Sequence, residues 1–204
     1  MLEETFKSLA HRYQSDTQDA EKLWKELVMN YSAGNRHYHT LSHLHYLLIQ
    51  ISTCQNTITD LDAVLFALYY HDAVYDVLRK DNEEKSALLA EKRMTTLIVP
   101  HRRIVLCKQH ILATKIHTLS ANPDTNLFTD ADLSILGEDW NTYCNYSNQV
   151  RKEYSVYPDL LYKPGRKKVL KHFLQMERIF KTNSFFNTYE TQARKNIEKE
   201  FNLL

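Results

Sequence analysis

The sequence predicts an all-α fold, and three observations lead to that prediction. Glycine occurs only three times and proline four times in 204 residues, below their usual shares of about 7% and about 5%. Apolar residues recur at helical spacing in long segments, and charged stretches separate those segments. A chain of this length can bury a substantial core, so we expect one helical domain over residues 1–204 rather than two small ones.

The first three helices are expected in residues 15–31, 40–51 and 60–76. The first begins with Ser15 and Asp16, which are typical capping residues, and continues with apolar residues at helical intervals. The second, "TLSHLHYLLIQI", follows the unusual segment "AGNRHYHT". The third, "DLDAVLFALYYHDAVYD", is apolar nearly all round, which predicts a central position in the bundle.

The next three helices are expected in residues 81–98, 102–117 and 126–137. Asp81 begins the first of them and Glu84 follows three residues later, which predicts a capping box with Asp in the Ser/Thr role. The segment "RRIVLCKQHILATKIH" forms the second helix. The third, "NLFTDADLSILG", is short and ends at a glycine, as helices often do.

The C-terminal part of the chain predicts three further helices. Proline and glycine in "YPDLLYKPG" predict a turn after the first of the three. The helices are expected in residues 139–154, 165–180 and 187–201.

Composition and charge exclude several classes of protein. Lys and Arg (26) nearly balance Asp and Glu (25), so no overall charge favours a nucleic-acid polymer or an anionic membrane as partner. The N-terminus "MLEETFKSLAHRYQ" lacks the apolar stretch of a signal peptide, and no uncharged apolar run of about 18 residues follows. We therefore expect a cytoplasmic protein whose three cysteines are reduced.

Two adjacent ionisable residues, His71 and Asp72, lie within the apolar segment 60–76. On a helix, Asp72 would lie at the centre of the apolar stripe, between Leu65 and Leu68. A buried carboxylate is costly unless it is paired or bound to a cation. The pair is explained either by a core histidine hydrogen-bonded to an acid or by a metal site.

Four histidines lie close together in "RHYHTLSHLH", at positions 37, 39, 43 and 45. His39 and His43 are four residues apart and share one helix face. Periodicity alone does not choose a ligand among them, because a polar helix start with solvated imidazoles would give the same pattern. The choice depends on the rest of the chain.

An ordered set of motifs resembles the HD-domain superfamily of metal-dependent phosphohydrolases. The segments "RHYHTLSH", "HDAVYD" and "DADLSILG" reproduce its H…HD…D pattern in order. Together with "VLRKDNEEKSA", "ATKIH" and "VRKEYSVYPDLLYKPGRKKVL", they are similar to one branch, the small predicted metal-dependent HD phosphohydrolases, from about residue 20 onward. The resemblance implies an HD-type helical domain with a central metal site. Its core would span about residues 36–137, and the C-terminal helices of residues 139–204 would pack on that core.

The resemblance also implies a set of metal ligands: His43, His71, Asp72 and an aspartate of "DADL". If that segment is helical, Asp132 falls in the middle of its apolar face and Asp130 points away, so we expect Asp132 to be the ligand. Two imidazoles and two carboxylates suit Mn, Fe, Co, Ni or Zn, with Mg as a further candidate. We expect one ion rather than two.

The implied activity is hydrolysis of a small phosphorylated substrate by attack of metal-bound water, with a nucleotide as the first candidate. Either a phosphomonoester or a phosphodiester would suit this chemistry. Asp76 and Glu83 are the catalytic candidates, because each could orient a ligand or the attacking water, or act as a base. A solvated acid at a helix start explains Glu83 equally well. The candidates for binding the substrate phosphate are Arg36, His39, Lys115 and His117.

Three other functions stay open from the sequence. The chain could be a non-catalytic HD module that binds a metal and a nucleotide. It could be an HD-type di-iron oxygenase, which would need further ligands such as His110 or His117. It could also be a metal-free helical interaction protein. In each case we expect no nucleic-acid polymer and no membrane as partner, and a homodimer is compatible with the sequence.

Overall fold

The computed structural model describes residues 1–13 and 17–204, and over these residues the protein is all-α. The described part contains ten α-helices, two short 3-10 helices and no strand, which confirms the predicted all-α class, although the sequence predicts nine helices. Ser15 and Asp16, the expected capping residues of the first long helix, lie outside the described residues. No helix in the described part is both long enough and apolar enough to cross a membrane.

The chain divides into two compact units, Met1–Thr129 and Asp130–Leu204, and the division falls within helix α7 (Pro123–Leu133). The expected single domain over residues 1–204 stays a prediction. The other helices of the first unit are α1 (Leu2–His11), α2 (Thr17–Tyr31), α3 (Leu41–Cys54), η1 (Gln55–Thr57), α4 (Leu61–Tyr70), α5 (Asn82–Thr96) and α6 (His101–Ala113).

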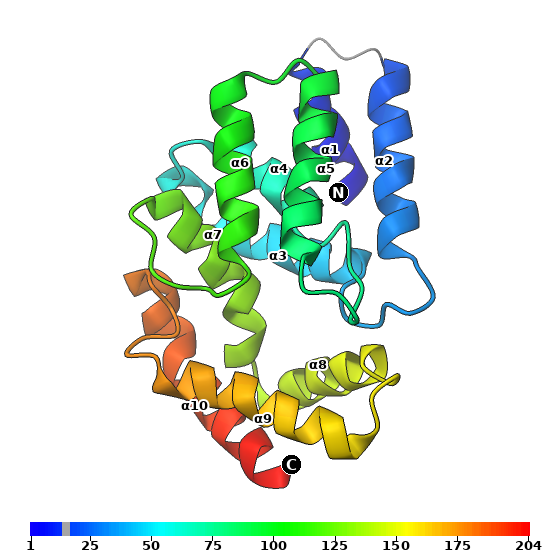
Figure 1. The fold of residues 1–204 in the computed structure, drawn as a ribbon. Coiled ribbons are helices and arrows are strands. Elements are labelled where there is room, and N and C mark those ends of the chain that lie inside the picture. The colour runs from blue at the N-terminus through cyan, green and yellow to red at the C-terminus, as the bar shows by residue number, and fades with distance from the viewer. Residues whose placement is uncertain (14–16) are drawn as a thin grey trace. The chain divides into compact units, whose positions relative to one another are not determined.

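Helix α4 forms the centre of the first unit, as its apolar sequence predicts. Every residue from Asp62 to Tyr70 is buried. Helices α5 and α6 run side by side and both pack against α4 (Figure 1). Helix α1, which the periodicity did not indicate, also contacts α4, and it buries Phe6, Leu9 and Ala10. A ten-residue amphipathic helix shows too few turns for its pattern to stand out.

The central helix is shorter than expected, because it ends at Tyr70 rather than at Asp76. His71 occupies its C-cap, and Asp72 follows in a turn. Side chains of α5 hold this turn in place: the Ser86 hydroxyl bonds to both the N–H and the C=O of Val74, at 3.1 and 3.2 Å. These bonds replace the ones that a continued helix would make. The expected helical position of Asp72 is therefore wrong.

The capping box expected at the start of α5 does not form. Asp81 is the N-cap residue, but its side chain makes no cap hydrogen bond. Its carboxylate instead accepts two hydrogen bonds of 2.8 Å from Arg79, and Glu84 pairs with Lys115. These ion pairs occupy both carboxylates in place of the box.

The second unit continues from α7 through η2 (Ser134–Gly137), α8 (Trp140–Glu153), α9 (Asp159–Gln175) and α10 (Asn183–Leu203). Helix α10 packs against η2 and α9. The turn expected over residues 157–165 is wrong for most of that range. Helix α9 begins at Asp159 and includes Pro164 near its start. Pro164 and Gly165 are exposed, so water can satisfy the carbonyl group that proline leaves without a helical partner.

Candidate metal centre

His43 is positioned by the first turn of α3. Thr40 is the N-cap residue, with its hydroxyl accepting a hydrogen bond of 3.3 Å from the N–H of Ser42. The N–H of His43 in turn donates to the carbonyl of Thr40, at 3.0 Å. This cap fixes the direction in which the His43 ring leaves the helix, and the ring is buried.

His71 is held in one tautomer by the backbone of α4. Its Nδ1 lies 3.0 Å from the carbonyl oxygen of Leu68. A carbonyl oxygen only accepts, so Nδ1 carries the proton and, in the neutral ring, Nε2 presents a lone pair. A histidine whose Nδ1 donates to a carbonyl in this way is prepared to bind a metal through Nε2.

The acceptor atoms around His71 require either a second ring proton or a metal ion among them. Nε2 of His71 lies 3.0 Å from Oδ2 of Asp72 and 3.1 Å from Nε2 of His43. A lone pair on nitrogen and a carboxylate oxygen repel each other at this distance unless a second proton or a metal ion lies between them. Adjacent donors in an octahedral shell with bonds of about 2.1 Å stand about 3.0 Å apart, so the two observed separations fit a shared metal ion.

Asp72 is ionised in this environment. Burial alone would raise the pKa of its carboxyl group, but the neighbouring histidines, His71 foremost, outweigh burial and hold the pKa well below its usual range. His39, a predicted phosphate-binding residue, is one of them, with Nε2 at 3.9 Å from Oδ2 of Asp72. The ring of His39 packs on that of Tyr75, with 4.2 Å between centroids. His39, His43, His71 and Asp72 thus form one cluster.

Two side chains far away in the sequence hold the backbone beneath Asp72. The N–H of Asp72 donates to the hydroxyl of Tyr31 at 3.3 Å. Arg36 donates to the carbonyl oxygens of His39, Asp72 and Ala73, at 3.1, 2.7 and 3.1 Å. The guanidinium group of Arg36 therefore ties the histidine segment to the turn that carries Asp72. Its predicted role in binding phosphate stays a prediction, and the role of Tyr31 was not foreseen because nothing in its sequence surroundings marks it.

Asp132 supplies a third member of a group that could hold a metal ion. One ligand atom each from His43, His71 and Asp132 lies within 4.8 Å of the other two, and both histidines are buried. Helix α7 carries Asp132, and its first turn is anchored to the start of α4. There the carboxylate of Asp124 accepts hydrogen bonds of 2.9 Å from the N–H groups of Thr59 and Asp60.

Asp130 has a different role from its neighbour. The sequence predicts that it points away from the apolar face, and the structure shows that it is fully buried. Its carboxylate accepts hydrogen bonds from the N–H of Lys181 and from both the N–H and the hydroxyl of Thr182, at 2.7 to 2.9 Å. Asp130 thereby fixes the segment that leads into α10. Burial raises the pKa of its carboxyl group, although Lys181 and the hydrogen bonds oppose the shift.

The remaining predicted site residues lie on the turn after Asp72, on α5, or just after α6. Oδ1 of Asp76 accepts a hydrogen bond of 2.9 Å from the N–H of Leu78. Glu83 lies 4.0 Å from the ammonium group of Lys115, which also donates to the carbonyl of Lys80 at 2.8 Å. His117 adopts a left-handed backbone conformation, with φ of 51°. The catalytic roles of Asp76 and Glu83 and the phosphate-binding roles of Lys115 and His117 stay predictions.

His110 is a buried histidine beside this cluster. Its Nδ1 lies 2.8 Å from the hydroxyl oxygen of Thr125. The ring of Phe128 is near both its ring and that of His71, with centroid distances of 6.2 and 5.8 Å. In the described part of the chain, the group of possible metal ligands includes neither His110 nor His117.

The structure therefore contains a buried His-His-Asp group that could hold one metal ion, with Asp72 directly beside it. A scan of protein-family models found no match to this chain, and comparisons with curated proteins and with solved structures found none either.

Proposed function

We propose that this protein is a metal-dependent phosphohydrolase of the HD-domain superfamily and that it acts on a small phosphate ester. A nucleotide is the first substrate to test. The metal would be held by His43, His71, Asp72 and Asp132. The ion would be a transition-metal dication, since two imidazoles and two carboxylates suit such ions and together balance their charge.

The observation that carries this proposal is the group of facing acceptors around Nε2 of His71. Its proton is on the other ring nitrogen, toward Leu68, and a carboxylate oxygen and a second imidazole lie within 3.1 Å. One dication would bind all of these acceptors at once. The ordered H…HD…D pattern supports the same ligand set independently.

The chain's own residues would prepare this site for hydrolysis. A bound dication would lower the pKa of a water molecule and polarise a phosphoryl oxygen. Leu68 would keep His71 in the tautomer that binds metal, and Arg36 and Tyr31 would keep Asp72 in place. His39, with an exposed edge next to Asp72, is placed to donate a hydrogen bond to a phosphate oxygen.

The test combines metal analysis with a screen for phosphate release. Purified protein would be analysed for bound metal and then assayed with p-nitrophenyl phosphate, bis(p-nitrophenyl) phosphate and a panel of nucleotides. We expect activity that chelator removes and that Mn²⁺ or Co²⁺ restores. Binding of a nucleotide without phosphate release would instead identify a non-catalytic module.

Asp132→Asn and Asp130→Asn form a matched pair for this test. Each change replaces one carboxylate of α7 by an amide of the same shape. Asp132→Asn should lose metal and activity, because it removes a ligand charge. Asp130→Asn should keep both, because Asp130 bonds to the segment before α10. Full turnover by metal-free protein, or metal loss only in Asp130→Asn, would contradict the proposal.

A further inference from the structure

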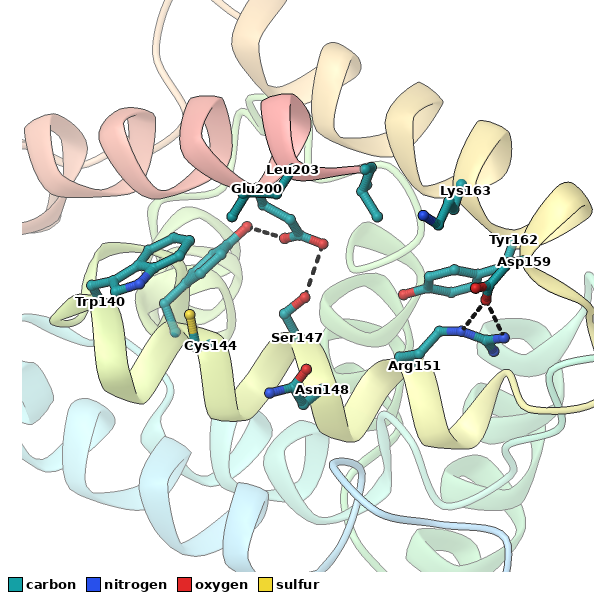
Figure 2. Close-up of a pocket in the computed structure, with 12 residues that line it drawn as sticks. Trp140, Cys144, Ser147, Asn148, Arg151, Asp159, Tyr162, Lys163, Glu200 and Leu203 are labelled. Atoms are coloured by element: carbon teal, nitrogen blue, oxygen red, sulfur yellow. Dashed lines mark hydrogen bonds and ion pairs between the residues drawn. The ribbon is translucent and has the colours of Figure 1, made fainter.

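A pocket of about 280 Å³ lies within the second unit, between α8, the first turn of α9 and the end of α10 (Figure 2). Its lining residues come from positions 140–163 and 200–204, and none of them belongs to the metal group. Drug-sized ligands occupy pockets of about 300 Å³ or more, so this pocket suits a smaller molecule.

One wall of the pocket is a closed polar network around Glu200. Arg166 donates to both carboxylate oxygens, at 2.8 and 2.9 Å, and Ser147 donates to one of them at 2.9 Å. The hydroxyl of Tyr143 donates to the other. Burial opposes ionisation of Glu200, but Arg166 and the hydroxyl donors hold its pKa below the usual value. Both oxygens have protein partners, so Glu200 stiffens the wall and is not available to accept a ligand's hydrogen bond.

The opposite wall presents a donor that the protein does not use. The side chain of Tyr162 is 8% exposed, and its hydroxyl has no hydrogen-bond partner among the described residues. Figure 2 shows this hydroxyl directed into the pocket. The guanidinium group of Arg151 lies 4.5 Å from the centre of the ring and holds it in place. Burial raises the pKa of Tyr162, so the hydroxyl keeps its proton and can donate it. Buried hydroxyl groups normally have a partner, which here would be a ligand atom.

The side-chain charge around Tyr162 favours a ligand with a single negative charge. Arg151 is paired with Asp159, at 2.8 Å, and Glu200 with Arg166. Lys163 is half-buried at the pocket, and no ion pair to it is found in the described part of the chain. Among the lining side chains, Lys163 therefore gives one unpaired positive charge next to an unused hydroxyl donor. A carboxylate would pair with the ammonium group and accept the hydroxyl's hydrogen bond. A phosphate dianion would keep one of its two negative charges without a partner.

Apolar side chains form a further part of the pocket, beside Asn148 and Cys144. Trp140 stacks on Tyr143 with 5.7 Å between ring centroids, and both rings line the pocket. Leu203 lies at the edge and is 70% exposed, so a bound molecule would remove apolar surface of this side chain from water. A ligand with an apolar body on its acidic group fits this surface.

We propose that this pocket binds a small monocarboxylic acid with an aromatic or aliphatic body. The carboxylate accepts hydrogen bonds from the hydroxyl of Tyr162 and the ammonium group of Lys163. The body of the ligand packs against Trp140 and Leu203. This site does not depend on the proposed phosphohydrolase activity.

Phenylacetate and hexanoate are the probes for the test, with phenethyl alcohol as the neutral analogue and phenyl phosphate as the dianion. Binding would be followed by NMR on the intact chain. The protein has two tryptophans, so the indole N–H signal of Trp140 can be assigned and followed directly. We expect phenylacetate or hexanoate to shift this signal in the millimolar range or below, and the two other compounds to bind more weakly.

Tyr162→Phe and Lys163→Gln are the test variants, and Lys168→Gln is the matched control on an exposed part of the same helix. Tyr162→Phe keeps the ring on Arg151 and removes a hydroxyl that has no protein partner, so the fold should be retained. Each test variant should weaken carboxylate binding about tenfold, the effect of one hydrogen bond to a charged group, and the control should not. The proposal is wrong if neither acid binds, if phenethyl alcohol or phenyl phosphate binds as tightly, or if Tyr162→Phe binds the acids unchanged.

Discussion

The buried ring of His110 allows a quantitative prediction about stability and pH. Burial lowers the pKa of His110 from 6.5 to about 4, although the nearby acids Asp124 and Asp60 oppose the shift. The ring accepts or donates one hydrogen bond, through Nδ1 and the hydroxyl of Thr125, and its Nε2 has no hydrogen-bond partner in the described residues. The perturbation is His110→Gln, which keeps a polar side chain but cannot take up a proton.

The sign and size of the effect follow from the two pKa values. Above pH 6.5 the ring is neutral in both the folded and the unfolded chain, so the stability is complete. As the pH falls from 6.5 toward 4, the unfolded chain binds a proton that the folded chain does not, and the free energy of unfolding decreases. The difference between the two pKa values limits the loss in free energy of unfolding to about 3 kcal/mol. About 2.5 kcal/mol of this should be lost by a pH of about 4.5.

The assay is urea unfolding of wild type and His110→Gln at pH values of about 7 and about 4.5, in the presence of chelator. Acidic residues and the other histidines titrate in both proteins, so their effects cancel in the comparison. The wild type should lose about 2.5 kcal/mol more than the variant over this interval. Direct NMR titration of the His110 ring should show a midpoint well below 6.5. Equal pH dependence of the two proteins would refute the reasoning.

Three further substitutions test how the structure supports the site. Asp130→Ala should lower the free energy of unfolding by about 3 kcal/mol in urea titrations, because it leaves a buried ammonium group and the N–H groups before α10 without their acceptor; an unchanged midpoint would contradict this. Arg36→Ala should reduce metal affinity by about 10- to 100-fold in a calorimetric titration, because three carbonyl groups lose their donor. A raised KM with unchanged metal affinity would instead support the phosphate role. Gly137→Ala should cost about 2–3 kcal/mol in thermal unfolding, because its Cβ would stand 2.6 Å from Cβ of Tyr189 and 2.7 Å from its carbonyl oxygen. At Gly165 an added Cβ meets no atom within 4 Å, so Gly165→Ala is the control and should be neutral or stabilising.

The sequence predicts the helices well where local forces decide, and less well where a distant side chain does. The apolar segment before His71 is helical and central because burial of its side chains favours only that position. The end of α4 depends on Ser86, whose hydroxyl binds the backbone of Val74, twelve residues earlier in the chain. Periodicity carries no information about such a bond. For the same reason Asp81 looks like a capping residue in the sequence but pairs with Arg79 in the structure.

In the candidate site, too, the sequence indicates some residues and only the tertiary structure shows the others. His43, His71 and Asp132 are marked by residue type and by the order of their motifs, and the structure brings their ligand atoms within 4.8 Å. The supports of this group are not marked in this way. Tyr31 precedes Asp72 by 41 residues, and its hydroxyl is one of many in a chain with 13 tyrosines. Only tertiary packing distinguishes it from the others.

Asp130 and Asp132 show how far helical geometry can be taken in choosing a ligand. The angle of about 100° per residue correctly places the two carboxylates on different faces of α7. It cannot say which groups each face contacts. Asp130 is buried against the segment before α10, where the backbone N–H groups of Lys181 and Thr182 donate to its carboxylate. In a protein built of packed helices, a buried acid therefore indicates a positive partner, and the structure is needed to decide whether that partner is a metal ion or the protein itself.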